Sequence, residues 1–83
     1  MQEINHIATR YNVLDVRELV YADNSSGIVL ICKEYDNAKR RRIVVWDDNN
    51  KIFDEAKILA PGDIILVHDK VYGSTRTIEE IEC

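Results

Sequence analysis

The stretch RRIVVWDDNNKIFDEAKILAPGDIILV, residues 41–67, decides the fold because its hydrophobic pattern changes twice. Residues 41–47 alternate between two sets of side chains and are rich in β-branched residues, which predicts a strand. The apolar residues that follow have helical spacing: Ile52, Phe53, Ala56 and Leu59. Asn49 or Asn50 can cap this helix, and Pro61-Gly62 ends it. Ile64–Val67 is apolar and β-branched, so the stretch predicts strand, helix and strand in that order.

Four segments precede this stretch. Residues 4–11 carry apolar side chains at helical spacing, which predicts a short helix or turn. Residues 12–21 alternate with apolar side chains on both faces, which indicates a long strand with a bend. Residues 22–27 form a turn ending in Gly27, a residue that tolerates positive φ. Residues 28–34 are a second strand.

Two segments follow the stretch. Residues 68–74 contain Gly73 and are expected to turn the chain, and residues 75–81 are expected to form the last strand. The predicted order is three strands, one helix and two strands. This is the layout of the OB-fold, an all-β, five-stranded Greek-key barrel, here with one capping helix between its third and fourth strands. Residues 1–83 would form this single domain.

Length and composition limit the class of protein to which this chain can belong. A chain of 83 residues with 46% apolar and 31% charged residues is one small globular domain. No apolar run approaches the ~20 residues that span a bilayer, and residues 1–10 do not resemble a signal peptide. We therefore expect an intracellular protein, cytoplasmic or nucleoid-associated, that does not contact membranes. Cys32 and Cys83 are expected to stay reduced.

The sequence carries no catalytic or cofactor motif. It has no Gly-rich phosphate loop and no nucleophile elbow, so we expect a non-catalytic protein without a small-molecule cofactor. His6 and His68 lie in different elements, and the cysteine and histidine spacing predicts no metal site. Asp47 and Asp48 would point to opposite faces of a strand, so they are interpreted as turn and helix-capping residues.

The strand at residues 41–47 offers a binding surface. If Ile43 and Val45 face the core, then Arg42, Val44 and Trp46 face outward, and Trp46 is displayed beside Arg42. An exposed indole next to a guanidinium can stack on a base while the cation meets a phosphate. The alternative is that Trp46 packs into the core, and the pattern alone leaves both open. Tyr72, in the expected turn, is likewise either a stacking residue or a cover for the barrel rim.

The segments Arg42–Asp48 and Leu59–Val67, together with the opening at Asn12–Arg17, resemble the OB domains of replication protein A and archaeal single-stranded-DNA-binding proteins. The similarity extends over residues 4–81. It implies that two aromatic residues stack on bases: Trp46, at the end of the third strand, and Tyr72, which with Gly73 matches the family's aromatic-Gly turn. It also implies that basic residues of the hairpin between the second and third strands contact the nucleic-acid backbone.

The leading hypothesis is therefore binding of single-stranded nucleic acid, DNA rather than RNA, across the concave barrel face. The expected contacts are Trp46, Tyr72, Arg42, Arg41, Arg40, Lys33, Lys70 and Arg76. One alternative is an accessory module that assembles with other OB-fold subunits or with itself in a replication-protein-A-like complex. The net charge of −4 and the three glutamates within residues 79–82 favour that alternative. An RNA- or tRNA-binding domain is the other alternative.

Overall fold

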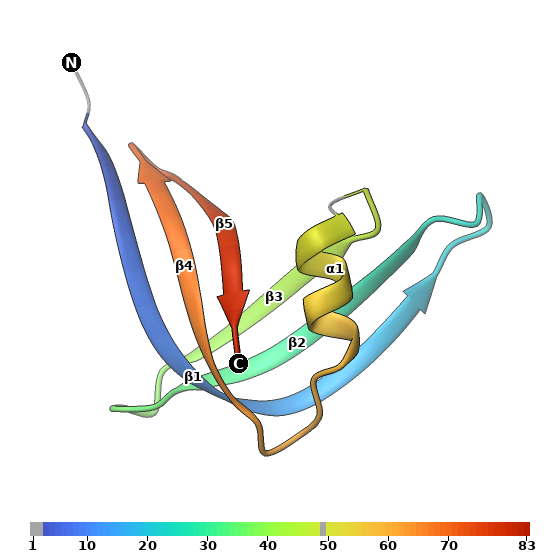
Figure 1. Ribbon diagram of the computed structural model, residues 1–83, viewed down its shortest axis with the longest axis horizontal. Helices are drawn as coiled ribbons and strands as arrows, with labels where there is room; N and C mark the ends of the chain where they lie inside the picture. The colour runs from blue at the N-terminus through green and yellow to red at the C-terminus, as the bar shows by residue number, and fades with distance from the viewer. Residues whose placement is uncertain (1–2, 49) are drawn as a thin grey trace.

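The computed structural model describes residues 3–48 and 50–83. Within these residues the chain is mostly β, with five antiparallel strands and one short helix (Figure 1). The elements are β1 (Ile4–Val20), β2 (Ser26–Glu34), β3 (Arg40–Trp46), α1 (Asn50–Lys57), β4 (Ile64–Tyr72) and β5 (Thr75–Glu82). The predicted order of three strands, a helix and two strands is confirmed. None of the described helical residues forms a segment long and apolar enough to cross a membrane.

The long strand β1 organises the sheet. Its second half, from Tyr11 to Val20, pairs with β2, and its first half, from Ile4 to Asn12, pairs with β4. The strand order is β3-β2-β1-β4-β5, so β3 and β5 are the edges of this sheet. Figure 1 shows the sheet curling into a half-barrel, with β1 passing from one half to the other.

The core fills the inside of this curl. Leu30 of β2, Ile43 of β3 and Ile65 of β4 are fully or almost fully buried. All four of the predicted apolar residues belong to the same cluster: Ile52, Phe53 and Ala56 of α1, and Leu59 just after the helix. The helix contacts β2, β3 and β5 and so covers the open side of the curl.

A shift in the pairing of β1 with β2, between Val13 and Asp15, lies where the sequence predicted a bend. Such a bulge inserts one extra residue and changes which side chains face the core. Val13 is buried and Val16, three residues later, also packs against the core, whereas Leu14 between them is exposed. The bulge explains why β1 carries apolar residues on both faces.

Three local predictions were wrong. Residues 4–11 are strand rather than helix, because each of them pairs with a residue of β4, and Ile4 and Ile7 remain exposed. Residues 68–72 continue β4 for the same reason, which leaves only Gly73 and Ser74 between β4 and β5. Gly27 does not adopt positive φ; it lies inside β2, and Asn24 has φ 68° instead.

The helix begins at Asn50, and the alternative cap, Asn49, lies outside the described residues. Cys32 and Cys83 are free thiols, the first buried and the second exposed. Burial raises the pKa of the Cys32 thiol to about 11, so this side chain behaves as a small apolar core group.

Candidate nucleic-acid interface

Strand β3 divides its side chains between two faces. Ile43 and Val45 are buried in the core, while Arg40, Arg42, Val44 and Trp46 are exposed. This alternation is the one predicted from the sequence, and it follows from the two-residue period of a strand. Trp46 keeps 41% of its surface exposed, so it does not pack into the core. It lies on the face turned away from α1, because the core and the helix occupy the concave side. The predicted position of the binding surface, on the concave face, is therefore wrong for Trp46, which lies on the outer face.

The Trp46 ring lies over Gly27, its partner across the β2–β3 pair. A Cβ atom at Gly27 would lie 3.2 Å from Cε3 of the indole, so a larger residue would displace the ring. Tyr21, directly after β1, packs beside the indole with ring centroids 5.3 Å apart and an angle of 34° between the rings. Tyr21 is 47% exposed. We call these two side chains the Tyr21–Trp46 platform.

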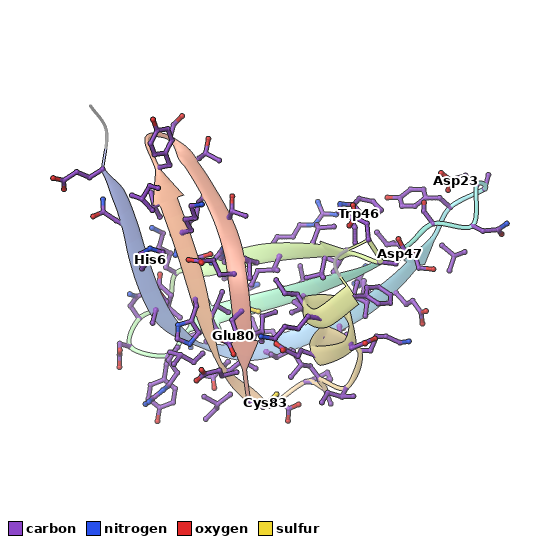
Figure 2. The ribbon with its side chains drawn as sticks, turned by 45° about the horizontal axis from the view of Figure 1, so that its top comes forward. His6, Asp23, Trp46, Asp47, Glu80 and Cys83 are labelled. Atoms are coloured by element: carbon purple, nitrogen blue, oxygen red, sulfur yellow. The ribbon has the colours of Figure 1, made fainter. Side chains whose placement is uncertain are left out.

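The turn after β1 holds the platform in place. Tyr21 N–H donates to the Ser25 carbonyl at 2.9 Å, which closes the turn on itself. The Asp23 carboxylate accepts hydrogen bonds from the Ser25 hydroxyl and amide, and these bonds lower the pKa of Asp23. Asp47 Oδ2 accepts from the Ser26 amide at 2.8 Å and ties this turn to the end of β3. Figure 2 shows Asp23, Trp46 and Asp47 at the same end of the molecule.

A row of cations shares the face of Trp46. Arg40 lies directly opposite Lys33 on β2, and Arg42 lies two residues further along β3. Residues two apart on a strand point to the same side, so Arg40, Arg42 and Trp46 follow one another on one face. Among the described residues, neither Arg40 nor Arg42 takes part in an ion pair. We call Lys33, Arg40 and Arg42 the basic row.

Arg41 and Arg76 have an internal partner instead. Arg41 binds both carboxylate oxygens of Asp69, at 2.7 and 2.9 Å, and Arg76 binds the same carboxylate through Nε at 3.0 Å and Nη2 at 2.8 Å. Asp69 is fully buried. Burial acts to raise the pKa of Asp69, but the hydrogen bonds from the two guanidinium groups outweigh it and hold that pKa below its ordinary value. The group joins β3 and β5 through β4.

A groove runs between the two edge strands. Its walls are Arg41–Trp46 of β3 and Arg76–Ile78 of β5, and Ile52 of α1 lines it as well. Arg41 and Arg76 also line a second hollow that contains Lys39 and Arg40. The two hollows therefore adjoin and form a path from Trp46 to Arg40. Even with Asp69 ionised, the two arginines bound to it leave one positive charge beside this path.

Tyr72 and Lys70 lie elsewhere. Tyr72 is the last residue of β4, is 50% exposed and pairs with Ile4 of β1. Both residues lie on the same face of β4 as His68. The buried residues Val67 and Asp69 lie on the other face, so Tyr72 and Lys70 point away from the core. Neither lines the groove. The structure thus brings Trp46, Arg42, Arg40 and Lys33 together and places Tyr72 and Lys70 on the half of the sheet formed by β1, β4 and β5.

The sequence did not point to Tyr21 as a site residue. Knowledge of the strand register could have found it. Gly27 of β2 pairs with Leu19 of β1 on one side and with Trp46 of β3 on the other, so Tyr21, directly after the end of β1, lies near the indole. The partner role of Asp69 had no comparable signal, since the residue was expected in a turn. Comparison of the chain with protein-family models, with curated proteins and with solved structures found no match.

Proposed function

We propose that the protein binds single-stranded nucleic acid, preferentially DNA, on the outer face of β2 and β3. The observation that carries this proposal is the Tyr21–Trp46 platform at one end of the basic row, on a single exposed face. Aromatic side chains bind bases by stacking, with about 1–3 kcal/mol per base, and cations next to them bind the phosphates. Exposed rings lie beside cations that form no ion pair within the described part of the chain, and an extended nucleic-acid strand requires both groups.

We further propose that the five strands are an opened OB-fold barrel. The strand order β3-β2-β1-β4-β5 and a helix between β3 and β4 support this assignment. In such a barrel β3 and β5 lie next to each other, and here residues of both strands line one groove, which supports the assignment. Tyr72 and Lys70 would then contact only the part of the nucleic acid that passes over the β4–β5 hairpin.

The test is the binding of a short fluorescein-labelled oligothymidine, followed by anisotropy at low salt. Trp46→Ala removes a stacking surface and should weaken binding about 5- to 150-fold, the equivalent of one stack. Trp46→Phe keeps an aromatic face and should retain most of the affinity. Tyr35→Ala, which removes another exposed ring, from the β2–β3 turn, is the matched control and should bind like the unmodified protein.

The proposal fails if the unmodified protein does not bind at low salt, or if Trp46→Ala binds as well as Trp46→Phe. Tighter binding of oligouridine than of oligothymidine would move the proposal from DNA to RNA.

The second candidate function is assembly with another protein subunit, which the two edge strands favour because β3 and β5 present unpaired backbone groups. Self-association in sedimentation, with no oligonucleotide bound, would support that candidate.

A further inference from the structure

The outer face of β4 and β5 carries a cluster of ligating side chains that the chain spacing did not reveal. His68 on β4 lies directly opposite Glu80 on β5, and Glu82 lies two residues further along the same face. One ligating atom from each of these three side chains lies within 4.8 Å of the others. Two carboxylates and one imidazole form a set of oxygen and nitrogen donors that suits a divalent transition metal such as Zn²⁺.

The geometry of His68 is a second, independent indication. Its Nε2 atom is buried and, among the described residues, makes no hydrogen bond, although Glu82 Oε1 lies only 3.2 Å away. A nitrogen and a carboxylate oxygen at that separation repel each other unless a proton or a metal ion lies between them. Two donors that each lie ~2.1 Å from a tetrahedral ion are about 3.4 Å apart, close to the observed separation.

A hollow borders His68 and Glu80, whereas Glu82 borders a separate hollow. The residue opposite His68 on β1 is Ala8, whose apolar side chain offers the imidazole no hydrogen bond. His68 and Glu80 line a hollow together with His6 and Glu79, which are joined to each other by a contact of 2.7 Å. Figure 2 shows His6 and Glu80 on the half of the molecule away from Trp46. One opposing charge is present, since Lys51 Nζ lies 3.9 Å from Glu80 Oε1.

We propose that His68, Glu80 and Glu82 form a surface site for a divalent transition-metal ion, with Zn²⁺ as the ion to test. The three side chains supply three ligands, and water completes the coordination. The site is separate from the proposed nucleic-acid interface, because its residues lie on the outer face of β4 and β5 whereas the platform and the basic row lie on β2, β3 and the turn after β1. Its existence does not depend on that proposed function.

Calorimetric titration of the purified protein with Zn²⁺ tests the site. We expect one ion to bind, and we expect His68→Gln, Glu80→Gln and Glu82→Gln each to weaken binding more than about tenfold, because even an outer-shell partner of a ligand costs 10–100-fold. Lys51→Ala removes the opposing charge and should tighten binding. Mg²⁺ should bind far more weakly, since a hard cation disfavours an imidazole ligand.

Three control variants address the other potential ligands on the surface. His6→Gln and Glu79→Gln alter the neighbouring pair, and Cys83→Ser removes the exposed thiol next to Glu82. All three should bind Zn²⁺ like the unmodified protein. The assignment is overturned if the unmodified protein binds no Zn²⁺, or if any of these controls loses binding to the same extent as the three ligand variants.

A second readout separates ligation from a change in folding. Titration with Zn²⁺ should shift the NMR signals of the His68 ring and leave those of His6, which serves as an internal reference, close to their starting positions. A shift of both rings, or of His6 alone, would place the ion in the neighbouring hollow and contradict the three-residue site.

Discussion

At the scale of single residues, Asp69 is the polar group that links the two edge strands of the sheet. It is fully buried and binds guanidinium groups from β3 and β5. Asp69→Asn would leave the half-buried Arg41 without its counter-charge, and removing one partner of a buried ion pair costs about 3–5 kcal/mol. We expect a loss of this order in urea unfolding. Arg76→Gln should cost less, because that side chain is 42% exposed. Equal losses in the two variants would contradict this ranking.

The same carboxylate makes stability depend on pH. Its pKa in the folded protein lies below the ordinary value of 3.8, so the folded state holds the ionised form more strongly than the unfolded state does. This contribution is fully present above the unfolded pKa and is lost as the pH falls through the lower, folded pKa. The free energy of unfolding should therefore decrease below about pH 4. Asp69→Asn should flatten that decrease, and an unchanged pH profile would show that other carboxylates dominate.

Gly27 matters because of its neighbour rather than its backbone. Gly27→Ala would place a Cβ 3.2 Å from the indole of Trp46, so the ring must shift by a few tenths of an ångström. We expect oligothymidine binding to weaken about two- to tenfold, part of the energy of one stack. Ser74→Ala, in the turn between β4 and β5, should leave binding unchanged. If Gly27→Ala binds normally and keeps its tryptophan emission, the ring position is not critical for binding.

At the scale of elements, α1 stabilises the sheet through its apolar face. Ile52 is 3% exposed within α1, and Ile58, directly after the helix, is 74% exposed. Ile52→Ala leaves a cavity in the core and should cost about 2–5 kcal/mol. Ile58→Ala deletes the same atoms from the surface and should change stability by less than about 0.5 kcal/mol. Thermal melting of the two variants checks the difference; similar melting temperatures would mean that α1 does not cover the core as described.

The same elements show how much the sequence could predict. The α1 face and the alternation along β3 were correct because both depend on residues close together in the chain, where the periods of helix and strand are expressed directly. The first half of β1 was mistaken for a helix because its strand conformation comes from pairing with β4, some sixty residues later. Tertiary pairing of this kind overrides local spacing.

The candidate sites also differ in whether they depend on local spacing or on pairing between distant segments. The shared face of Arg42, Val44 and Trp46 could be predicted from one strand alone, but whether Trp46 is exposed or packs into the core could not. The internal role of Arg41 could not, because it requires Asp69 to reach the core from β4. His68, Glu80 and Glu82 were also beyond prediction, since only the register of β4 with β5 brings an imidazole from one strand beside carboxylates from the next.

At the scale of the whole molecule, the distribution of charge matters more than its sum. The net charge is −4, yet Lys33, Arg40 and Arg42 share one exposed face, while acidic residues 79, 80 and 82 lie on β5. An anionic chain would therefore be drawn to one side of the protein only. If these three cations each meet a phosphate, the logarithm of the binding constant should fall with the logarithm of salt concentration with a slope of about −2.

Removal of two of these charges tests that distribution directly. Arg40→Gln combined with Arg42→Gln should reduce the steepness of the salt dependence by about 1.4, at ~0.7 per lost contact with a single strand. The control combines Arg10→Gln with Lys57→Gln, which changes the net charge equally but removes cations that lie outside the basic row. Its salt slope should stay within about 0.3 of the original, because distant exposed charges are screened. If both double variants lose the same slope, the oligonucleotide senses only the overall charge, and the basic row is not where its phosphates bind.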